Sequence, residues 1–276
     1  MEKRSEQENE IYLATGFREV DASGDAATFA ACLRFLNSLD YFRRYKEESY
    51  QILDLQKGDC VLDAGCGLGE DLYQMAARIT PGGRAVGIDA SRHLIETARR
   101  DPRYGTLPVR FLQADLRHIP LEDASFTHVR IDRVLQHIEA CETVLHELHR
   151  LLKTGGKILA YDNDWRSFSI RGTVASPISR LIETHWCDSF ARPSIGAELQ
   201  KLLQNTGFRS IQLKTFHSVI ESFETADSVY DLSRTLHHLV REAQIGRKEA
   251  MQWIEAARGD PAFCVTLRSF LVWGIK

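Results

Sequence analysis

Apolar residues recur along this chain in two alternating patterns. Short apolar runs, typical of buried strands, alternate with stretches in which apolar residues recur every three or four positions, as in helices. The runs lie at 60–64, 84–88, 109–112, 126–131 and 157–161, and the helical stretches between them include 70–79, 91–100 and 142–152. This alternation predicts an α/β fold with a doubly wound parallel sheet.

Several segments lie outside this alternation. Residues 25–55 and 222–258 have helical spacing and predict two or three helices each, whereas 162–193 hold aromatic residues without a clear period. The rest of the chain predicts a helix over 195–205 that ends at Gly207, a strand over 208–213 and a final strand over 263–275.

Composition narrows the classes of partner. Hydrophobic residues make up 43% and charged residues 26% of the 276 residues, which is typical of a soluble globular protein. The formal net charge of −3 gives no basic excess, so we expect no nucleic-acid partner. No apolar run approaches the ~20 residues that span a bilayer, and no signal sequence is recognisable, which predicts a cytoplasmic protein without a membrane span. Six scattered cysteines without a C-x-x-C pair predict free thiols.

The most informative stretch follows the first strand. Asp63 lies near the strand's end, and Gly65, Gly67 and Gly69 then alternate with other residues before the helix at 70–79. Glycine lets the backbone turn sharply and leaves no Cβ between the backbone and a ligand. The first turn of the helix also offers N–H groups without helical partners. The stretch therefore predicts a nucleotide-type site at the carboxyl end of a parallel strand.

The acidic residues beside the glycines indicate which ligand fits. The dinucleotide fingerprint is G-x-G-x-x-G, whereas here the spacing is G-x-G-x-G and Glu70 stands where the third glycine would be. Carboxylates at Glu70 and Asp63 would repel a pyrophosphate, but Asp63 would attract an ammonium group. S-adenosylmethionine has an α-amino group, a sulfonium and no phosphate. The D-x-G-C-G-x-G run resembles motif I of the class I S-adenosylmethionine-dependent methyltransferases.

Residues at the ends of later strands also resemble motifs of this family. The resemblance implies that Asp89 accepts hydrogen bonds from both ribose hydroxyls and that Ala90 and Leu94 lie near the adenine. It also implies that Asp115 accepts from the adenine amino group and that Leu116 covers the ring. The full set of implied cofactor-binding residues is Asp63, Gly65, Cys66, Gly67, Asp89, Ala90, Leu94, Asp115, Leu116, Arg130 and Ile131.

A longer resemblance, across nearly the whole chain, indicates one group within these methyltransferases. Residues 130–137, Arg-Ile-Asp-Arg-Val-Leu-Gln-His, resemble the R-x-D-R-V-L-Q-H stretch of a type 11, ubiquinone/menaquinone-biosynthesis-like group of small-molecule methyltransferases. The resemblance implies a Rossmann-like sheet of seven strands, the last antiparallel, within a single methyltransferase domain over 1–276. That domain would comprise an N-terminal helical cap at 25–55, a cofactor-binding core at 56–162, and a second core half with cap insertions at 163–276.

The expected activity is methyl transfer to a small, largely apolar or aromatic molecule, in a pocket walled by 25–55, 162–193 and 222–258. Methyl transfer needs a base only when the acceptor atom carries a proton of high pKa. His137 and Asp132 are the candidates, with a structural role as the alternative for His137. The rival function is a non-methylating protein that binds or cyclises a small molecule on the same scaffold.

Two further expectations follow from the residues. His146 and His149 are three positions apart, not the four of a zinc helix, and no third ligand is near, so we expect no metal. The oligomeric state is open, with a homodimer as one option.

Overall fold

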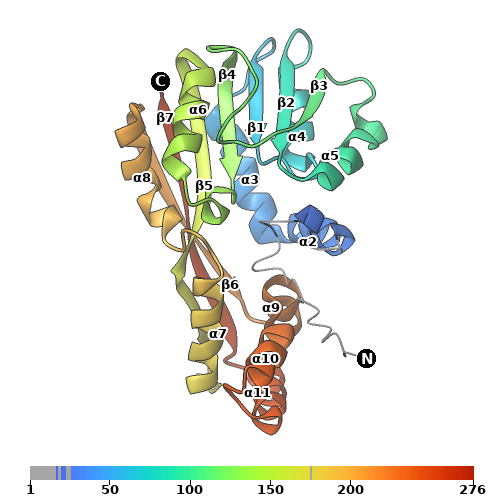
Figure 1. The fold of residues 1–276 in the computed structure, drawn as a ribbon, viewed down its shortest axis with the longest axis vertical. Coiled ribbons are helices and arrows are strands. Elements are labelled where there is room, and N and C mark those ends of the chain that lie inside the picture. Colours follow the sequence, from blue (N-terminus) through green and yellow to red (C-terminus); the bar gives the residue numbers. More distant parts are fainter. Residues whose placement is uncertain (1–16, 18–19, 23–25, 175) are drawn as a thin grey trace, which may run out of the picture.

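A seven-stranded sheet in the order β3-β2-β1-β4-β5-β7-β6 runs through the computed structural model, which describes residues 17, 20–22, 26–174 and 176–276 (Figure 1). Strands β1 to β5 pair in parallel, and β7 is antiparallel to both β5 and β6. The predicted fold class, with its antiparallel last strand, is confirmed. The strands are β1 (Cys60–Ala64), β2 (Arg84–Asp89), β3 (Val109–Gln113), β4 (Phe126–Asp132), β5 (Leu152–Arg171), β6 (Arg209–Ile220) and β7 (Cys264–Ile275).

Helices connect and cover these strands. The α-helices are α2 (Ala26–Ser38), α3 (Asp40–Leu53), α4 (Glu70–Ile79), α5 (Arg92–Arg99), α6 (Cys141–Leu151), α7 (Pro177–Asp188), α8 (Ile195–Thr206), α9 (Phe223–Tyr230), α10 (Leu232–Arg241) and α11 (Arg247–Gly259). Short 3-10 turns are η1 (Val20–Ala22), η2 (Pro102–Tyr104) and η3 (Leu135–His137). Ser91 caps α5 by accepting from the Leu94 N–H, and Gly207 ends α8 in the left-handed conformation, as predicted.

The two faces of the parallel part of the sheet pack into separate cores. Val61 of β1 belongs to the cluster that includes Met75 of α4, whereas the next residue, Leu62, belongs to the cluster that includes Leu145 of α6. Alternate strand residues point to opposite faces, so β1 is buried on both. This double burial explains why β1 is a continuous apolar run.

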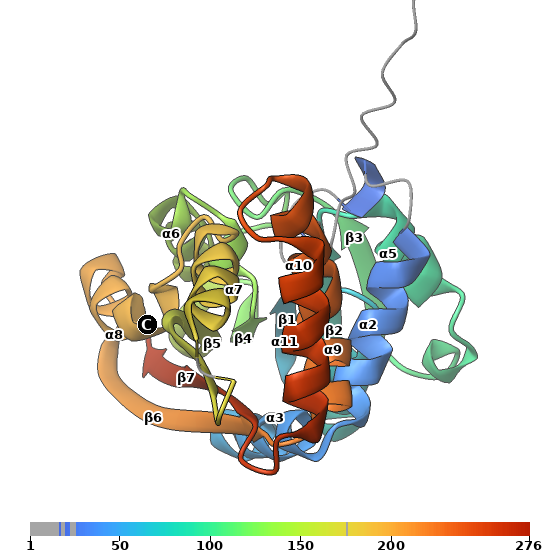
Figure 2. The same ribbon diagram turned by 90° about the horizontal axis from the view of Figure 1, so that it is seen from below.

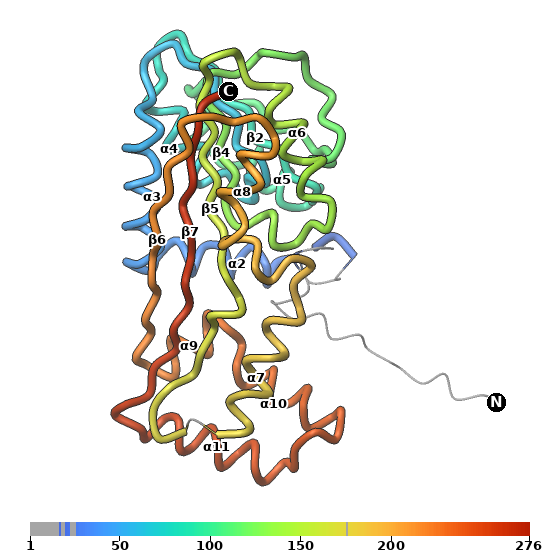
Figure 3. Tube along the Cα trace, turned by 90° about the vertical axis from the view of Figure 1, so that its left-hand side faces the viewer, coloured from blue at the N-terminus to red at the C-terminus, as the bar shows by residue number. Residues whose placement is uncertain are grey.

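Of the last three strands, β5 and β6 are much longer than predicted, whereas β7 matches its predicted range. All three extend beyond the parallel strands as a ribbon along the molecule (Figure 3), and α7 and α9–α11 pack near its far end (Figure 1). Seen from below, α7 and α10 lie side by side (Figure 2). We call the part of β5 from Trp165 to Arg171, together with α7 and α9–α11, the distal end. The expectation of an irregular segment over 162–193 is wrong, because β5 continues to Arg171 and α7 follows.

The apolar pattern does not indicate this part of β5, because several of its buried residues are polar. Asp162, Asn163 and Asp164 are all buried, but their partners lie about a hundred residues away or on another element. Asn163 Oδ1 accepts from Ser269 Oγ at 2.8 Å, and Asp164 pairs with Arg268 at 2.8 Å. Such long-range partners satisfy polar groups inside a sheet without leaving a local signal.

Three further findings concern the described residues. All six cysteines are free thiols. No helix there has the length and apolar character needed to cross a membrane. The same residues contain no group of three or more potential metal ligands placed to share an ion. The predicted domain begins at residue 1, but its first sixteen residues lie outside the described part.

Candidate cofactor and acceptor site

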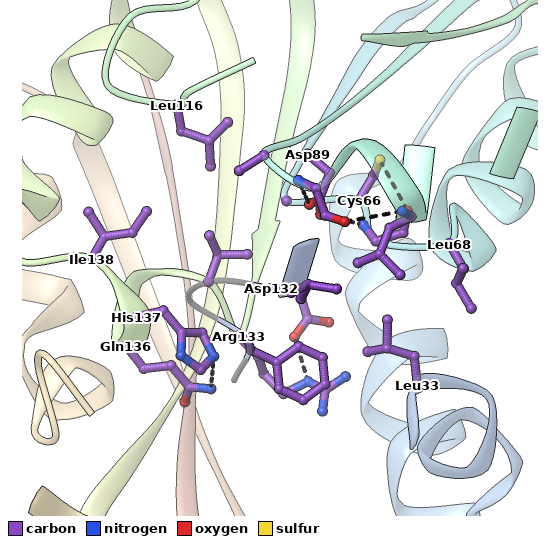
Figure 4. A pocket seen from close by; sticks show the side chains of 18 of the residues that line it. Leu33, Cys66, Leu68, Asp89, Leu116, Asp132, Arg133, Gln136, His137 and Ile138 are labelled. Carbon is purple, nitrogen blue, oxygen red and sulfur yellow. Dashed lines mark hydrogen bonds and ion pairs between the residues drawn. The ribbon is translucent and has the colours of Figure 1, made fainter. Parts of the chain in front are cut away.

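A cavity of about 950 Å³ lies at the carboxyl ends of β1 to β4 (Figure 4). Two of the predicted site residues, Asp63 and Ile131, do not line it, because both are buried beneath its surface. The predicted residues that do line it are Gly65, Cys66, Gly67, Asp89, Ala90, Leu94, Asp115, Leu116, Arg130, Asp132 and His137.

The glycine turn after β1 forms one wall of the cavity. Gly65 and Gly67 have φ angles of +78° and +53°, which side-chain-bearing residues rarely adopt. A Cβ on Gly65 would clash with Val134, and one on Gly67 would lie 3.2 Å from Leu33 of α2. The turn therefore passes directly under α2, and only glycine fits there without displacing a neighbour.

Asp89 ties the end of β2 to this turn. Its Oδ2 accepts from the Gly67 N–H at 2.8 Å, and its Oδ1 accepts from the Ser91 N–H at 2.9 Å. Burial raises the pKa of Asp89, and these two backbone donors oppose that shift. Each carboxylate oxygen keeps a further lone pair, so the residue can still accept from a diol. Ribose binding by Asp89 stays a prediction.

Asp21, which none of the sequence motifs indicates, contacts the start of α5 beside Asp89. Asp21 of η1 accepts from Ser91 Oγ at 2.5 Å, from the Arg92 N–H at 2.7 Å and from the His93 N–H at 3.2 Å. It therefore caps the start of α5 beside Asp89. Seventy positions separate Asp21 from Ser91 in the chain, so no local pattern could have indicated this contact.

A buried ion network underlies the other side of the glycine turn. Arg130 is 1% exposed, and its guanidinium lies 3.5 Å from Asp63, 3.2 Å from Asp71 and against Asp132. Lys46 of α3 reaches the same Asp71 at 2.7 Å. Burial raises the pKa of Asp63 despite Arg130. Asp63 thus faces Arg130, and its predicted contact with a cofactor ammonium group stays untested.

Sequence reasoning overlooked Asp71 and Lys46, although both line the cavity. The available signal was an acidic pair, Glu70 and Asp71, in the first turn of α4. We interpreted Glu70 as the informative member of that pair. In the structure Glu70 pairs with Arg103 at 2.6 Å, whereas Asp71 connects α4 to α3 and β4.

His137 lies at the opposite end of the cavity from the glycine turn (Figure 4). Gln136 Oε1 accepts from Trp165 Nε1 at 2.8 Å and from Asn163 Nδ2 at 3.1 Å. Because indole N–H can only donate, these contacts fix the orientation of the Gln136 amide. Its Nε2 therefore donates to His137 Nε2 at 3.1 Å, which makes that ring nitrogen the acceptor. The neutral histidine consequently carries its proton on Nδ1.

The walls around His137 differ from those predicted. Phe17, Leu33 and Ile138 line the cavity, but residues 222–258 contribute nothing to it, and Ala191 is the only contribution from the described residues of 162–193. The aromatic residues of 162–193 pack on one another instead: Trp165 stacks on Phe190 at 4.1 Å between ring centroids. They form the core of the distal end. Of the three predicted wall segments, 25–55 contributes most, through Leu33, Leu36, Asn37 and Lys46, and the predicted wall from 222–258 is absent.

The charges of the described lining indicate what the cavity accepts. Seven carboxylates line it, against four cations. The carboxylates belong to Asp21, Glu70, Asp71, Asp89, Asp115, Asp132 and Glu139, and the cations to Lys46, Arg117, Arg130 and Arg133. An acidic excess disfavours a pyrophosphate and suits a cationic sulfonium. With the diol acceptor at Asp89 and apolar Leu94 and Leu116 beside it, the residues fit S-adenosylmethionine.

Comparison with known proteins decides the family. A family model described as a methyltransferase domain matches residues 55–257. The chain belongs to the class I S-adenosylmethionine-dependent methyltransferases. It is 34% identical over 235 residues, 84% of this chain and 67% of the other, to an uncharacterized 37.1 kDa protein in a transposon of Streptomyces fradiae. It is 25% identical over 199 residues, 66% of this chain and 85% of the other, to a demethylmenaquinone methyltransferase of a Geobacillus species.

Among solved structures, the methyltransferase resembles a Haemonchus contortus phosphoethanolamine N-methyltransferase in complex with S-adenosyl-L-methionine. The TM-score is 0.58 at 16% identity, and the match covers 96% of this chain and 60% of that one. This likeness concerns the fold alone. Family membership makes the protein an enzyme that transfers methyl groups from S-adenosylmethionine. When bound, the cofactor would supply an electrophilic methyl group on a positively charged sulfonium, whose sulfur leaves as a neutral thioether.

Proposed function

We propose that this methyltransferase acts on a small, largely apolar or aromatic acceptor that enters beside His137. The observation that carries the proposal is the contrast between the two ends of the cavity. The end at Asp89 offers acceptors for a nucleoside, whereas the end at His137 offers the apolar side chains of Phe17, Val134 and Ile138. Apolar walls with a few polar groups are typical of sites for small aromatic ligands.

The names of relatives support an aromatic ring in particular. Demethylmenaquinone methyltransferases at 24–26% identity are among the matches, and a quinol ring would suit the apolar end. Family membership favours methyl transfer over the non-methylating alternative. Methyl transfer to such a ring depends chiefly on holding the acceptor in line with the methyl group.

Of the two candidate catalytic residues, we assign Asp132 a positioning role. Its carboxylate contacts the Arg130 guanidinium, and both oxygens accept from Tyr45 Oη, at 3.1 and 3.3 Å. A carboxylate committed to two donors has little capacity left to remove a proton from an acceptor. We propose that His137 orients the acceptor, since its Nε2 is held by Gln136. In that role it contacts the substrate through the ring rather than taking its proton.

Label transfer tests the proposed acceptor class. The enzyme is incubated with S-adenosylmethionine carrying a deuterated methyl group and two panels of small molecules, one of quinols and phenols and one of aliphatic amines. We expect mass spectrometry to find label on members of the aromatic panel. Label on amines alone, or on neither panel while the cofactor binds, would contradict the proposal.

A further inference from the structure

The four cations that line the described part of the cavity are not equally neutralised. Lys46 donates to Asp71 at 2.7 Å and Arg117 to Asp115 at 2.6 Å, and Arg130 donates to Asp132 and forms an ion pair with Asp71 at 3.2 Å. Each of these three makes a close contact with a carboxylate. Arg133 differs: no atom of its guanidinium makes a hydrogen bond to any described residue.

The surroundings of Arg133 explain why it is left without such a bond. Its Nε is 3.5 Å from Asp132 Oδ1, which is a long ion pair, and it is buried without a hydrogen-bond partner in the described chain. Asp132 already contacts Arg130 and accepts from Tyr45. The guanidinium instead lies over the Phe42 ring, 4.9 Å from its centroid, and the side chain is only 17% exposed. Burying an arginine without hydrogen bonds is costly, because water no longer solvates the charge.

The backbone of Arg133 is unusual as well. Its φ angle is +56°, in the left-handed region that long side chains rarely occupy. The Arg133 N–H donates to the Tyr161 carbonyl at 2.7 Å, which anchors the turn after β4 against β5. A strained backbone together with a buried guanidinium that makes no hydrogen bond is typical of residues that a protein keeps for a ligand.

We propose that Arg133 is the anion-binding group of this cavity and that it takes the carboxylate of a bound small molecule. A guanidinium fork matches the two oxygens of a planar carboxylate. A phosphate is a poorer candidate, because the seven carboxylates of the lining would repel its second charge.

Two molecules could bring this carboxylate. One is the cofactor, whose amino-acid part carries an α-carboxylate. The other is the acceptor, which would then be an aromatic acid; this second source rests on the proposed function. Both sources predict a site at Arg133, and binding measurements with small probes separate them.

The first measurement compares two cofactor analogues by calorimetry. S-adenosylhomocysteine has the α-carboxylate, and 5′-methylthioadenosine has the same nucleoside and thioether without the amino acid. If the cofactor is the source, Arg133→Gln weakens S-adenosylhomocysteine binding by roughly 10- to 100-fold and leaves methylthioadenosine unchanged. Arg117→Gln, at the predicted adenine end, is the matched control and should change both affinities alike or neither.

The second measurement titrates 2-naphthoate and its neutral counterpart 2-naphthamide into the enzyme loaded with S-adenosylhomocysteine. If the acceptor is the source, the wild type prefers naphthoate, Arg133→Gln loses that preference, and Arg133→Lys retains part of it. A thermal unfolding curve checks that each variant is folded. Wild-type behaviour of Arg133→Gln in both measurements, or equal weakening of both cofactor analogues, overturns the proposal. Neither readout involves methyl transfer, so this outcome leaves the proposed acceptor class to the label-transfer assay.

Discussion

The parallel half and the distal end of this methyltransferase use buried side chains for different purposes. Around the parallel strands, seven carboxylates and four cations line the described part of the cavity, and many of them are held by one another or by backbone N–H groups. At the distal end, the side chains of Trp165, Phe168, Trp186 and Tyr230 pack ring against ring and line no part of the cavity. The comparison indicates that ligand affinity resides in the parallel half, whereas the distal end contributes stability.

The largest effect should come from Gly67, at the cavity wall. Gly67→Val forces a branched side chain into a left-handed backbone 3.2 Å from Leu33, which displaces the turn that Asp89 holds. We expect calorimetry to detect no binding of S-adenosylhomocysteine while circular dichroism shows an intact fold. Gly58→Ala is the control, because Gly58 has the same backbone sign, φ +90°, with nothing within 4 Å of an added Cβ. Normal affinity in Gly67→Val would show that the turn does not touch the cofactor.

A substitution at the distal end should lower the stability of the fold and leave cofactor affinity unchanged. Phe168 is 4% exposed and contacts Trp165, Trp186 and Tyr230. Phe168→Ala should lower the free energy of unfolding by about 3–5 kcal/mol, through lost burial and the cavity left behind. Denaturant unfolding measures that loss, and calorimetry should find unchanged affinity for S-adenosylhomocysteine. A parallel loss of affinity would break the comparison, since it would couple the two ends.

Asp162 lies where the two ends meet, and it should make stability depend on pH. Burial raises its pKa to about 8 from an ordinary value near 3.8, so the folded protein keeps a proton that the unfolded chain has released. Between these values stability falls as pH rises, by up to roughly 1.4 kcal/mol per pH unit. Asp162→Asn cannot titrate and should lack this part of the slope. Thermal unfolding of both proteins from pH 5.5 to 8.5 tests this, and parallel curves would count against the assignment.

The same boundary separates what the sequence could predict from what it could not. The elements of the parallel half follow from local signals: an apolar run for β1, the cap at Ser91, the glycine turn. The extension of β5 begins with Asp162, Asn163 and Asp164, whose partners are distant in the chain. At the site, motif resemblance placed the residues around Asp89 at the cavity, but contacts between remote segments, such as Asp21 with Ser91, had no sequence signal.

Substitution of Asp89 should weaken cofactor binding less than substitution of Gly67. Asp89→Ala removes the predicted acceptor for the ribose hydroxyls and should weaken cofactor binding by about 1–3 kcal/mol. The comparison of S-adenosylhomocysteine with 5′-methylthioadenosine sharpens the result, because both carry the ribose and both should lose the same free energy. Because Asp89 also accepts from the Gly67 and Ser91 N–H groups, unfolding must be measured in parallel. Unchanged affinity in a folded variant would remove Asp89 from the site.

The smallest expected effect, at His137, distinguishes an orienting residue from a base. Gln136 donates to His137 Nε2, so this nitrogen can accept a substrate proton only after that hydrogen bond breaks. We therefore expect His137→Ala to raise KM for the acceptor about 2- to 10-fold with kcat nearly unchanged, as when one neutral contact is lost. Steady-state kinetics on an acceptor found by label transfer give both parameters. Gln136→Leu is the matched variant: it frees Nε2 and leaves the ring. If His137 is instead a base, its removal should lower kcat by about 10²–10⁴-fold at unchanged KM, and Gln136→Leu should then leave a kcat that still depends on His137.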